Sequence, residues 1–300
     1  MQSLNKHQAG IALLLVLMIT AVLSTVVILQ QYRTMQLVQL SEMTANSIAA
    51  RNAGISTRNQ LLFQILTTDI WAYGPAAGPS QTADESNDIN FWGEPFHRDD
   101  SEVTVVDAGS LLSLIPFDAD SWRAVLLSFG LEDPLPITDS IEDWIDQDDF
   151  VRLHGAESQD YATPGLPRND SPQSIDELLL VKNMTPSIFQ SLRPYISYYG
   201  GGTPATAFMP APLLPAFIGE MAVEQTVQQR SGQSDEFDDI LAPQSERGDV
   251  YPSSRLLVSI KTTKQNAVYQ ESFLLVRGVG TARFAYITEL RPNVIWKQEH

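Results

Sequence analysis

Residues 11–29 read IALLLVLMITAVLSTVVIL, a run of 19 residues without a charge that is rich in Leu, Ile, Val, Met and Ala. A helix needs about 20 apolar residues to cross the hydrocarbon core of a bilayer. A helix buried in a soluble core normally carries a polar face, whereas this run has only Thr20, Ser24 and Thr25. No small-x-small cleavage site ends the run, which argues against a removable secretory signal peptide. The stretch is therefore predicted to be a transmembrane helix.

The helical pattern continues beyond the apolar run. Ile48, Ile55 and Leu62 recur every seven residues and predict one amphipathic stripe that packs on a globular domain. Gly54 weakens this prediction, since glycine costs about 1 kcal/mol in a helix interior. A helix over residues 11–68 would be roughly 87 Å long at about 1.5 Å per residue. Its expected end is marked by two turn signals, Gly74-Pro75 and Gly78-Pro79.

The net charge comes from one block of the chain. Residues 84–161 hold 20 acidic and 3 basic residues, an excess equal to the whole net charge of −17. Such a balance disfavours the phosphate contacts that dominate nucleic-acid binding. The block is either a solvated face or a site for a divalent cation or a basic partner. The chain has no cysteine, which excludes disulfides, a thiolate nucleophile and Cys-type zinc sites.

Strands are predicted on either side of a long central segment. Residues 103–107 form a short β-prone run, and residues 255–262 alternate between apolar and polar side chains. Residues 268–277 and 281–290 supply two further runs, separated from their neighbours by polar or glycine-containing turns. Three neighbouring strands and a long N-terminal helix predict an α+β unit in which the helix covers one face of an antiparallel sheet.

Helix signals dominate residues 110–245, between these two sets of strands. They are N-terminal caps, capping boxes and a proline at the first helical position. The signals are Asp118 before residues 122–129 with Gly130 as the stop, Asp139 with Glu142, Ser174 with Glu177, and Thr185-Pro186 before a helix that ends at Leu192.

Residues 1–10, MQSLNKHQAG, are polar, end in Gly10, and lead at once into the apolar run at Ile11. This arrangement resembles the class III signal of type IV pilins and pseudopilins. The resemblance implies that prepilin peptidase cuts between Gly10 and Ile11, so that the apolar helix stays in the mature protein as filament core. Most of that superfamily has Glu at the fifth mature position, where this chain has Leu15. In that superfamily the Glu pairs with the N-terminal ammonium group of a neighbouring subunit, which offsets the cost of a carboxylate in lipid. A subunit at the filament tip has no neighbour above it, so an apolar residue costs less at this position.

Absence of that Glu is characteristic of the K-type minor pseudopilin of type II secretion systems, and two motifs extend the resemblance to that family. One runs from Ile141 to Tyr161 and contains DWIDQDD, Arg152 and GAE; the other, from Ser174 to Ile196, contains SIDEL, VKNMTP and LRPYI. The chain departs from the family at residues 200–215, which are rich in Gly, Pro and Ala where an Asn-rich segment is expected. The resemblance therefore implies no fold for residues 200–245.

The patterns and the resemblance together predict an α+β pseudopilin fold with a large inserted all-α domain. A long N-terminal transmembrane and amphipathic helix packs on an antiparallel sheet. The predicted parts are a leader peptide at residues 1–10, a transmembrane helix at 11–29, a pseudopilin α+β domain at 30–109 plus 246–300, and the inserted α-domain at 110–245.

The first motif carries the candidate metal ligands. Six carboxylates lie within 18 residues, and oxygen ligands at this density suit Ca²⁺, which takes six to eight oxygens. An EF-hand is excluded, because Phe150 and Val151 occupy its fifth and sixth positions when the loop starts at Asp146. Family members are thought to bind calcium in this domain; the alternative is a solvated loop in which Arg152 neutralises one carboxylate. The six residues are Asp143, Asp146, Asp148, Asp149, Glu157 and Asp160.

The resemblance implies a structural role rather than an enzymatic one. It implies a single-pass inner-membrane protein with a periplasmic C-terminal domain in a Gram-negative bacterium. There it would cap or initiate the pseudopilus with the minor pseudopilins I and J, for protein export across the outer membrane. The four histidines are scattered, and neither G-x-S-x-G nor H-E-x-x-H occurs.

Two other functions fit parts of the sequence. A minor pilin of a type IV pilus would share the same N-terminal region. Residues 181–196 also look like a helix-hairpin-helix, which would suit a membrane-tethered DNA-binding protein. Only Lys182 and Arg193 are basic in that hairpin, so the acidic surroundings favour a packing role and no nucleic-acid partner.

Overall fold

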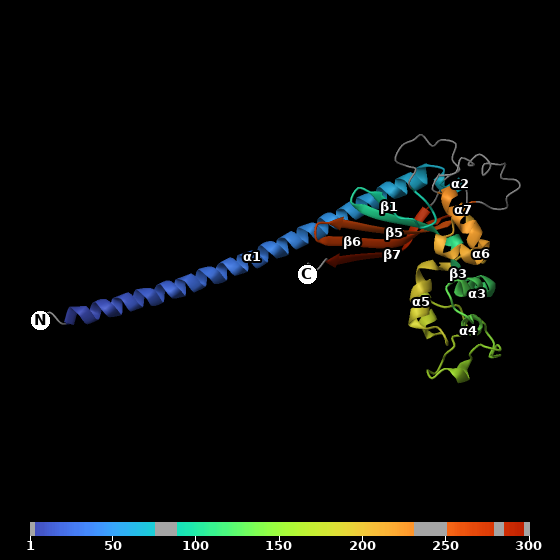
Figure 1. Ribbon diagram of the computed structural model, residues 1–300, viewed down its shortest axis with the longest axis horizontal. Helices are drawn as coiled ribbons and strands as arrows, with labels where there is room; N and C mark the ends of the chain where they lie inside the picture. The colour runs from blue at the N-terminus through green and yellow to red at the C-terminus, as the bar shows by residue number, and fades with distance from the viewer. Residues whose placement is uncertain (1–3, 76–88, 231–250, 279–284, 297–300) are drawn as a thin grey trace.

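A computed structural model describes residues 4–75, 89–230, 251–278 and 285–296, and a single long helix dominates it (Figure 1). Helix α1, Leu4–Thr67, is 64 residues long, which confirms the predicted continuous helix and extends it into the polar leader. Its N-terminal half projects away from the folded domains (Figure 1). The side chains of α1 from Leu13 to Thr44 are exposed. By length and composition, α1 contains one segment apolar enough to cross a membrane.

The C-terminal half of α1 lies along an antiparallel sheet of five strands (Figure 1). The order across the sheet is β1-β2-β5-β6-β7, so a long insertion separates two neighbouring strands. The predicted strands are confirmed, although residues 281–284, the start of the third C-terminal run, lie outside the described residues. The strands are β1 (Phe96–Arg98), β2 (Ser101–Asp107), β5 (Arg255–Lys264), β6 (Ala267–Arg277) and β7 (Ala285–Trp296).

The face of α1 that packs on the sheet differs from the predicted stripe. Ile48 is 54% exposed, and Ile55 and Leu62 are only half-buried. The buried positions are instead offset by a few residues and include small side chains, which let the helix approach the sheet closely. They are Ala50, Gly54, Thr57, Leu61 and Ile65. Periodicity of large apolar residues misses this face because glycine and threonine do not register as hydrophobic.

Buried polar contacts tie α1 to the sheet. Arg58 Nη1 lies 3.0 Å from Glu271 Oε2, and the Tyr269 hydroxyl donates a hydrogen bond of 2.7 Å to the same oxygen. Burial and the charge of Glu271 raise the pKa of Tyr269 to about 12, so its hydroxyl keeps its proton at neutral pH. The Glu271 side chain is fully buried, and both contacts reach its Oε2 atom.

The chain enters the inserted domain after β2 and returns to the sheet at β5. The carboxylate of Asp107 connects these two segments of the chain. Asp107, at the end of β2, is fully buried and accepts hydrogen bonds from the backbone N–H groups of Ser253 at 3.1 Å and Gly109 at 3.2 Å. Burial raises the pKa of Asp107, which those hydrogen bonds partly offset. Asp107 therefore holds together the two chain segments that connect the sheet to the inserted domain.

The inserted domain is mainly helical, but it is not all-α. Strands β3 (Leu112–Ile115) and β4 (Ile196–Tyr199) pair in parallel within it. The prediction missed them because each has only 4 residues, too few for a period-two pattern. The α-helices here are α3 (Ala119–Ser128), α4 (Leu135–Ile145), α5 (Pro186–Leu192), α6 (Pro215–Ile218) and α7 (Glu220–Arg230).

Short helices complete the described chain. Helix α2 (Ile70–Tyr73) follows α1 and ends at Gly74, whose φ of 91° agrees with the predicted stop; the second stop signal, Gly78-Pro79, lies outside the described residues. The 3-10 helices are η2 (Ala108–Ser110), η3 (Ser158–Asp160), η4 (Ile175–Leu180), η5 (Arg193–Tyr195), η6 (Thr206–Phe208) and η7 (Ala211–Leu213).

Two of the four predicted helix starts are confirmed and two differ. Asp118 precedes α3, although its side chain makes no capping hydrogen bond, and the Thr185 hydroxyl accepts a hydrogen bond of 3.2 Å from the N–H of Ile188 in α5. Asp139 does not cap a helix, because α4 already begins at Leu135 after Pro134. Ser174 precedes a 3-10 helix rather than an α-helix, and its side chain makes no capping hydrogen bond.

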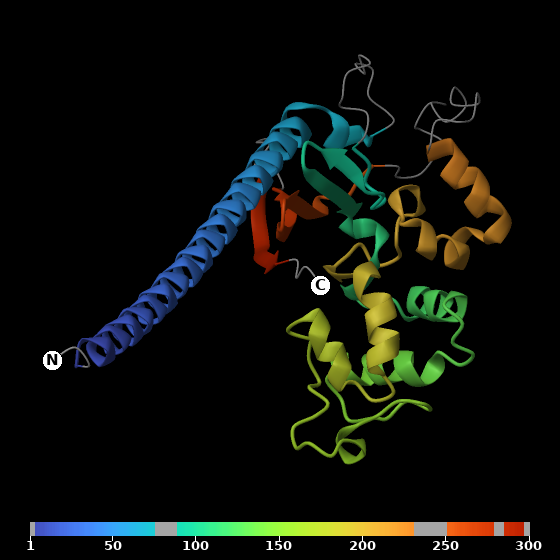
Figure 2. The same ribbon diagram turned by 60° about the vertical axis from the view of Figure 1, so that its left-hand side comes forward.

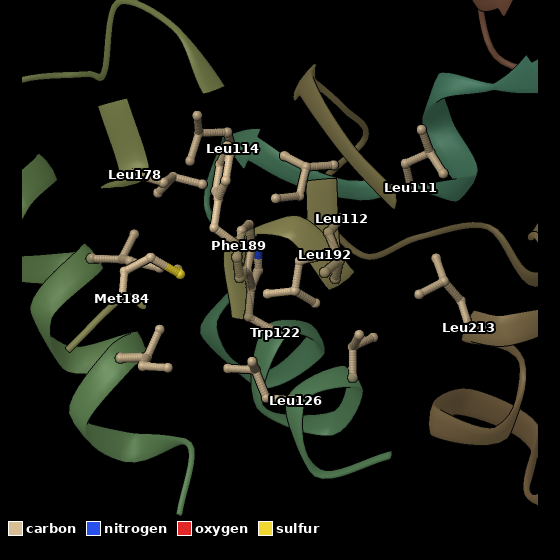
Figure 3. Packing of buried hydrophobic residues seen from close by; sticks show 14 of the residues in the cluster. Leu111, Leu112, Leu114, Trp122, Leu126, Leu178, Met184, Phe189, Leu192 and Leu213 are labelled. Atoms are coloured by element: carbon tan, nitrogen blue, oxygen red, sulfur yellow. The ribbon is translucent and has the colours of Figure 1, made fainter. Parts of the chain in front are cut away.

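The inserted domain has a hydrophobic core of its own (Figure 3). Trp122 of α3 lies near its centre, fully buried, and its indole N–H donates to the carbonyl of Ser113 in β3 at 3.0 Å. Trp144 is also buried and meets the ring of Tyr161 edge to face at 5.7 Å, so both are packing residues. A second cluster under α1 forms the core of the sheet domain.

Candidate functional site

The acidic loop after α4 is built around one arginine. Arg152 contacts three carboxylates of α4 and its end: Nη1 lies 2.6 Å from Asp143 Oδ1, Nε lies 3.3 Å from Glu142 Oε2, and Nη1 also binds Asp146 Oδ2. The sequence suggested that Arg152 neutralises one carboxylate, and Glu142 was missed as a partner. Glu142 lies on α4 and Asp146 follows its last residue, four positions later, a spacing that could have identified them as neighbours on one face.

Asp143 holds the loop in place. Its side chain is fully buried, and its carboxylate accepts hydrogen bonds from the backbone N–H groups of Arg152 at 3.2 Å and Ala156 at 2.8 Å. A Cβ atom at Gly155 would lie 1.9 Å from Asp143 Oδ2, so only glycine fits there. The carboxylate of Asp143 is therefore occupied by the loop backbone and by Arg152. Gly155 also belongs to the site, but a search for charged residues in the sequence cannot identify it.

Glu157 is a buried carboxylate with no ion-pair partner among the described residues. It is 1% exposed; its side chain caps η3 toward the backbone N–H of Asp160, and no other described donor satisfies its two carboxylate oxygens. Burial and the neighbouring charges of Asp143 and Asp146 raise the pKa of Glu157 to about 7. One oxygen of Asp146, Oδ1, is likewise buried without a partner in the described part of the chain. The loop thus contains acceptor atoms that a cation could satisfy.

The remaining predicted ligands have other partners. Asp148 Oδ1 accepts from the N–H of Phe150 at 2.9 Å, and Asp149 Oδ1 accepts from Asn169 Nδ2 at 3.1 Å. Asp160 pairs with Lys182 Nζ at 2.7 Å, and that hydrogen bond lowers the pKa of Asp160. Among the residues that the structure describes, no three His, Asp or Glu side chains are grouped closely enough to hold a metal ion. Of the six predicted ligands, Glu157 and Asp146 retain the buried oxygens that described hydrogen-bond donors satisfy least.

Changing Glu157 to Gln is expected to remove a pH-dependent loss of stability. The folded-state pKa of about 7 exceeds the ordinary value of 4.5. The stabilisation from the protonated form is thus complete below about pH 4.5 and is lost as pH rises to about 7. In chelator at pH 8, Glu157→Gln should raise the free energy of unfolding by about 2 kcal/mol, with little change at pH 4.5. Urea unfolding at both pH values measures this; equal stability of the two proteins at pH 8 would contradict it.

The N-terminal residues singled out by the sequence lie within α1. The helix runs without interruption through Gly10 and Ile11, and Leu15 is 54% exposed within the apolar run. The two basic residues of the hairpin at 181–196 are paired, Lys182 with Asp160 and Arg193 Nη2 with Asp176 at 3.1 Å. His154 lies exposed in the acidic loop.

Comparison with known proteins points to one family. The family model described as "Type II secretion system (T2SS), protein K" matches residues 109–201. The type II secretion system protein K of Klebsiella pneumoniae is 26% identical over 337 aligned positions, which cover 98% of this chain and 99% of that protein. The putative type II secretion system protein K of Escherichia coli K12 is 28% identical, over 64% of this chain and 63% of that protein.

One further relative and one solved structure complete the comparison. The type II secretion system protein K of Dickeya chrysanthemi is 32% identical over 40% of this chain and 36% of that protein. The solved structure is a chain of the GspK-GspI-GspJ complex from the type 2 secretion system of enterotoxigenic Escherichia coli. It aligns with a TM-score of 0.44 and 16% identity, over 87% of this chain and 99% of that one.

Proposed function

We propose that this chain, which belongs to the type II secretion system protein K family and is a minor pseudopilin of that system, stands at the tip of the pseudopilus. It would initiate or cap filament assembly together with the minor pseudopilins I and J. That role is structural, and the family is one of pseudopilins and not of known enzymes. The observation that carries the proposal is the architecture: an exposed apolar helix joined to a sheet domain that bears a bulky insertion.

The helix supplies the contact by which a subunit enters a filament. The side chains of α1 from Leu13 to Thr44 are exposed in the isolated chain. In a bilayer the apolar part is satisfied by lipid, and in a filament by the equivalent helices of neighbouring subunits. We place the folded domains in the periplasm and the prepilin peptidase cut between Gly10 and Ile11. The mature N-terminus would then lie at the inner membrane.

The tip position rests on two features of the chain. Leu15 stands where a carboxylate would need a neighbouring N-terminal ammonium group above it, which a tip subunit lacks. The inserted domain lies at the end of the molecule opposite the N-terminus (Figures 1 and 2). Its bulk would block the addition of a further subunit above it.

Co-purification from membranes tests the proposal. Tagged full-length chain is expected to purify with the minor pseudopilins I and J, and its N-terminus by mass spectrometry should be Ile11. Leu15→Glu should lower the yield of this complex several-fold, because a carboxylate in the apolar run lacks a partner; Leu17→Ile is the control. Association with pilus proteins instead, or an N-terminus at Met1 or beyond Leu29, would overturn the proposal.

We also propose that the acidic loop binds Ca²⁺, with Glu157 and Asp146 as the residues best able to hold it. Their incompletely satisfied buried oxygens support this proposal, and oxygen-rich loops are the usual ligands of Ca²⁺. At pH 8, Ca²⁺ at 100 times its dissociation constant should add about 2.7 kcal/mol to the free energy of unfolding.

A thermal-melting titration measures the effect of Ca²⁺. The rise in midpoint should exceed that in equal Mg²⁺, should vanish in Glu157→Gln, and should persist in Asp176→Asn, whose carboxylate pairs with Arg193 outside the loop. Equal effects of the two cations would refute the calcium site.

A further inference from the structure

The loop after α4 presents three apolar side chains to solvent. Phe150 is 83% exposed, Val151 48% and Leu153 90%. Single exposed apolar residues are ordinary on protein surfaces, but a group of them projecting from one loop is a mark of an interaction site. We call these three residues the distal apolar loop.

The backbone around these side chains is held in one conformation. Asp148 Oδ1 accepts a hydrogen bond from the N–H of Phe150, and Asn169 Nδ2 donates to the Asp148 carbonyl at 3.0 Å as well as to the Asp149 carboxylate. On the other side, the backbone N–H of Arg152 is bound by the buried carboxylate of Asp143. A backbone rearrangement that carried these side chains inward would break these contacts. Such pre-organisation lowers the entropic cost of binding.

The border of this surface is negative. Asp148 and Asp149 are exposed directly before Phe150. Arg152, the cation within the loop, already contacts Glu142, Asp143 and Asp146. Its charge is therefore not available to balance the exposed carboxylates.

Charge and position select the kind of molecule that fits. A second copy of the loop would place like charges opposite each other, which disfavours that contact. An anionic bilayer surface would repel the loop as well. Figures 1 and 2 also place the inserted domain far from the N-terminal part of α1 that enters the membrane. These arguments leave a partner protein with complementary chemistry.

We propose that the distal apolar loop docks into an apolar pocket on another protein whose rim carries Lys or Arg side chains. Phe150 and Leu153 are the anchors that fill the pocket, and Asp148 and Asp149 face the basic rim. Apolar anchors surrounded by polar contacts are the usual arrangement of binding energy in protein interfaces. The rim contacts make the association weaker at high salt.

Site-specific cross-linking in secreting cells identifies the partner. The full chain carries p-benzoylphenylalanine in place of Leu153, and a control carries it in place of Met221, which is 92% exposed on α7. The expected adduct joins position 153, and not position 221, to an apolar surface patch next to Lys or Arg residues of another protein. Adducts only to lipid or to a second copy of this chain, or no specific adduct, would overturn the proposal.

The cross-linked protein is then purified and titrated against variants of the full chain. Phe150→Ser with Leu153→Ser should weaken binding at least about tenfold. Asp148→Asn with Asp149→Asn should weaken it less and reduce its salt dependence, and Met221→Ser should change nothing. Unchanged affinity in the Phe150 and Leu153 variant would refute the docking site. Co-purification of the Phe150 and Leu153 variant with the minor pseudopilins I and J serves as an independent control. If this variant still assembles with them, the docking surface is distinct from the surface used in the proposed filament role.

Discussion

Gly54→Val is expected to lower the free energy of unfolding of the sheet domain by about 3 kcal/mol. An added Cβ would lie 2.5 Å from Cδ1 of Tyr269 and 3.1 Å from Oγ1 of Thr262. Tyr269 cannot yield, because it is 2% exposed and its hydroxyl is bound to Glu271. Intrinsic helix propensity alone predicts the opposite sign, since valine is favoured over glycine by a few tenths of a kcal/mol.

Urea unfolding followed by circular dichroism measures the effect, and amide hydrogen exchange of β5 and β6 localises it. Gly201→Val is the matched control, since nothing lies within 4 Å of a Cβ atom there. Tyr269→Ala in the Gly54→Val background should recover part of the loss, with a coupling energy of at least about 1 kcal/mol. Stabilisation by Gly54→Val would mean that α1 does not pack closely on β6.

Asp143→Ala is expected to cost the inserted domain about 3 kcal/mol of unfolding free energy. The substitution leaves the guanidinium of Arg152 and the N–H groups of Arg152 and Ala156 without the acceptor they share. It also opens space beside Gly155, where the carboxylate now fits against the backbone. The loop and the end of α4 should therefore lose their fixed arrangement.

Asp148→Ala is the control for Asp143→Ala, and measurement in chelator and in Ca²⁺ separates the structural role of Asp143 from a metal-binding role. Asp148 is exposed and accepts one hydrogen bond from Phe150, so its removal should cost no more than about 1 kcal/mol. The loss in Asp143→Ala should be the same in chelator and in Ca²⁺, because Asp143 acts through Arg152 and the backbone. A loss seen only in Ca²⁺ would make Asp143 a metal ligand instead.

Local chemistry was sufficient to predict the elements whose signals lie in neighbouring residues. The uncharged run at 11–29, the alternation in β5 and the Thr185-Pro186 start of α5 each depend on a few adjacent side chains. The capping box at Asp139 failed because Pro134 offers an earlier start, and the sequence alone does not rank the two. The short strands β3 and β4 form only because they meet each other across the inserted domain.

The candidate site, like the fold, was only partly predictable from the sequence. The density of acidic residues and the presence of Arg152 were visible in the chain, but not which carboxylates would be buried or paired. In the folded chain Asp143 pairs with Arg152 and Asp160 pairs with Lys182, whereas Glu157 is buried without a described ion pair. These roles depend on distances between residues that lie 9 to 22 positions apart.

The amino-acid sequence by itself determined that this protein has a long apolar helix, an α+β domain and a helical insertion. Those properties follow from hydrophobic periodicity and turn chemistry within short windows. Tertiary structure alone decided which face of α1 meets the sheet, because that face is set by the close approach permitted at Gly54 and not by hydrophobicity. It also decided which carboxylates are neutralised, since electrostatic energies depend on separation and burial, which exist only once the chain has folded.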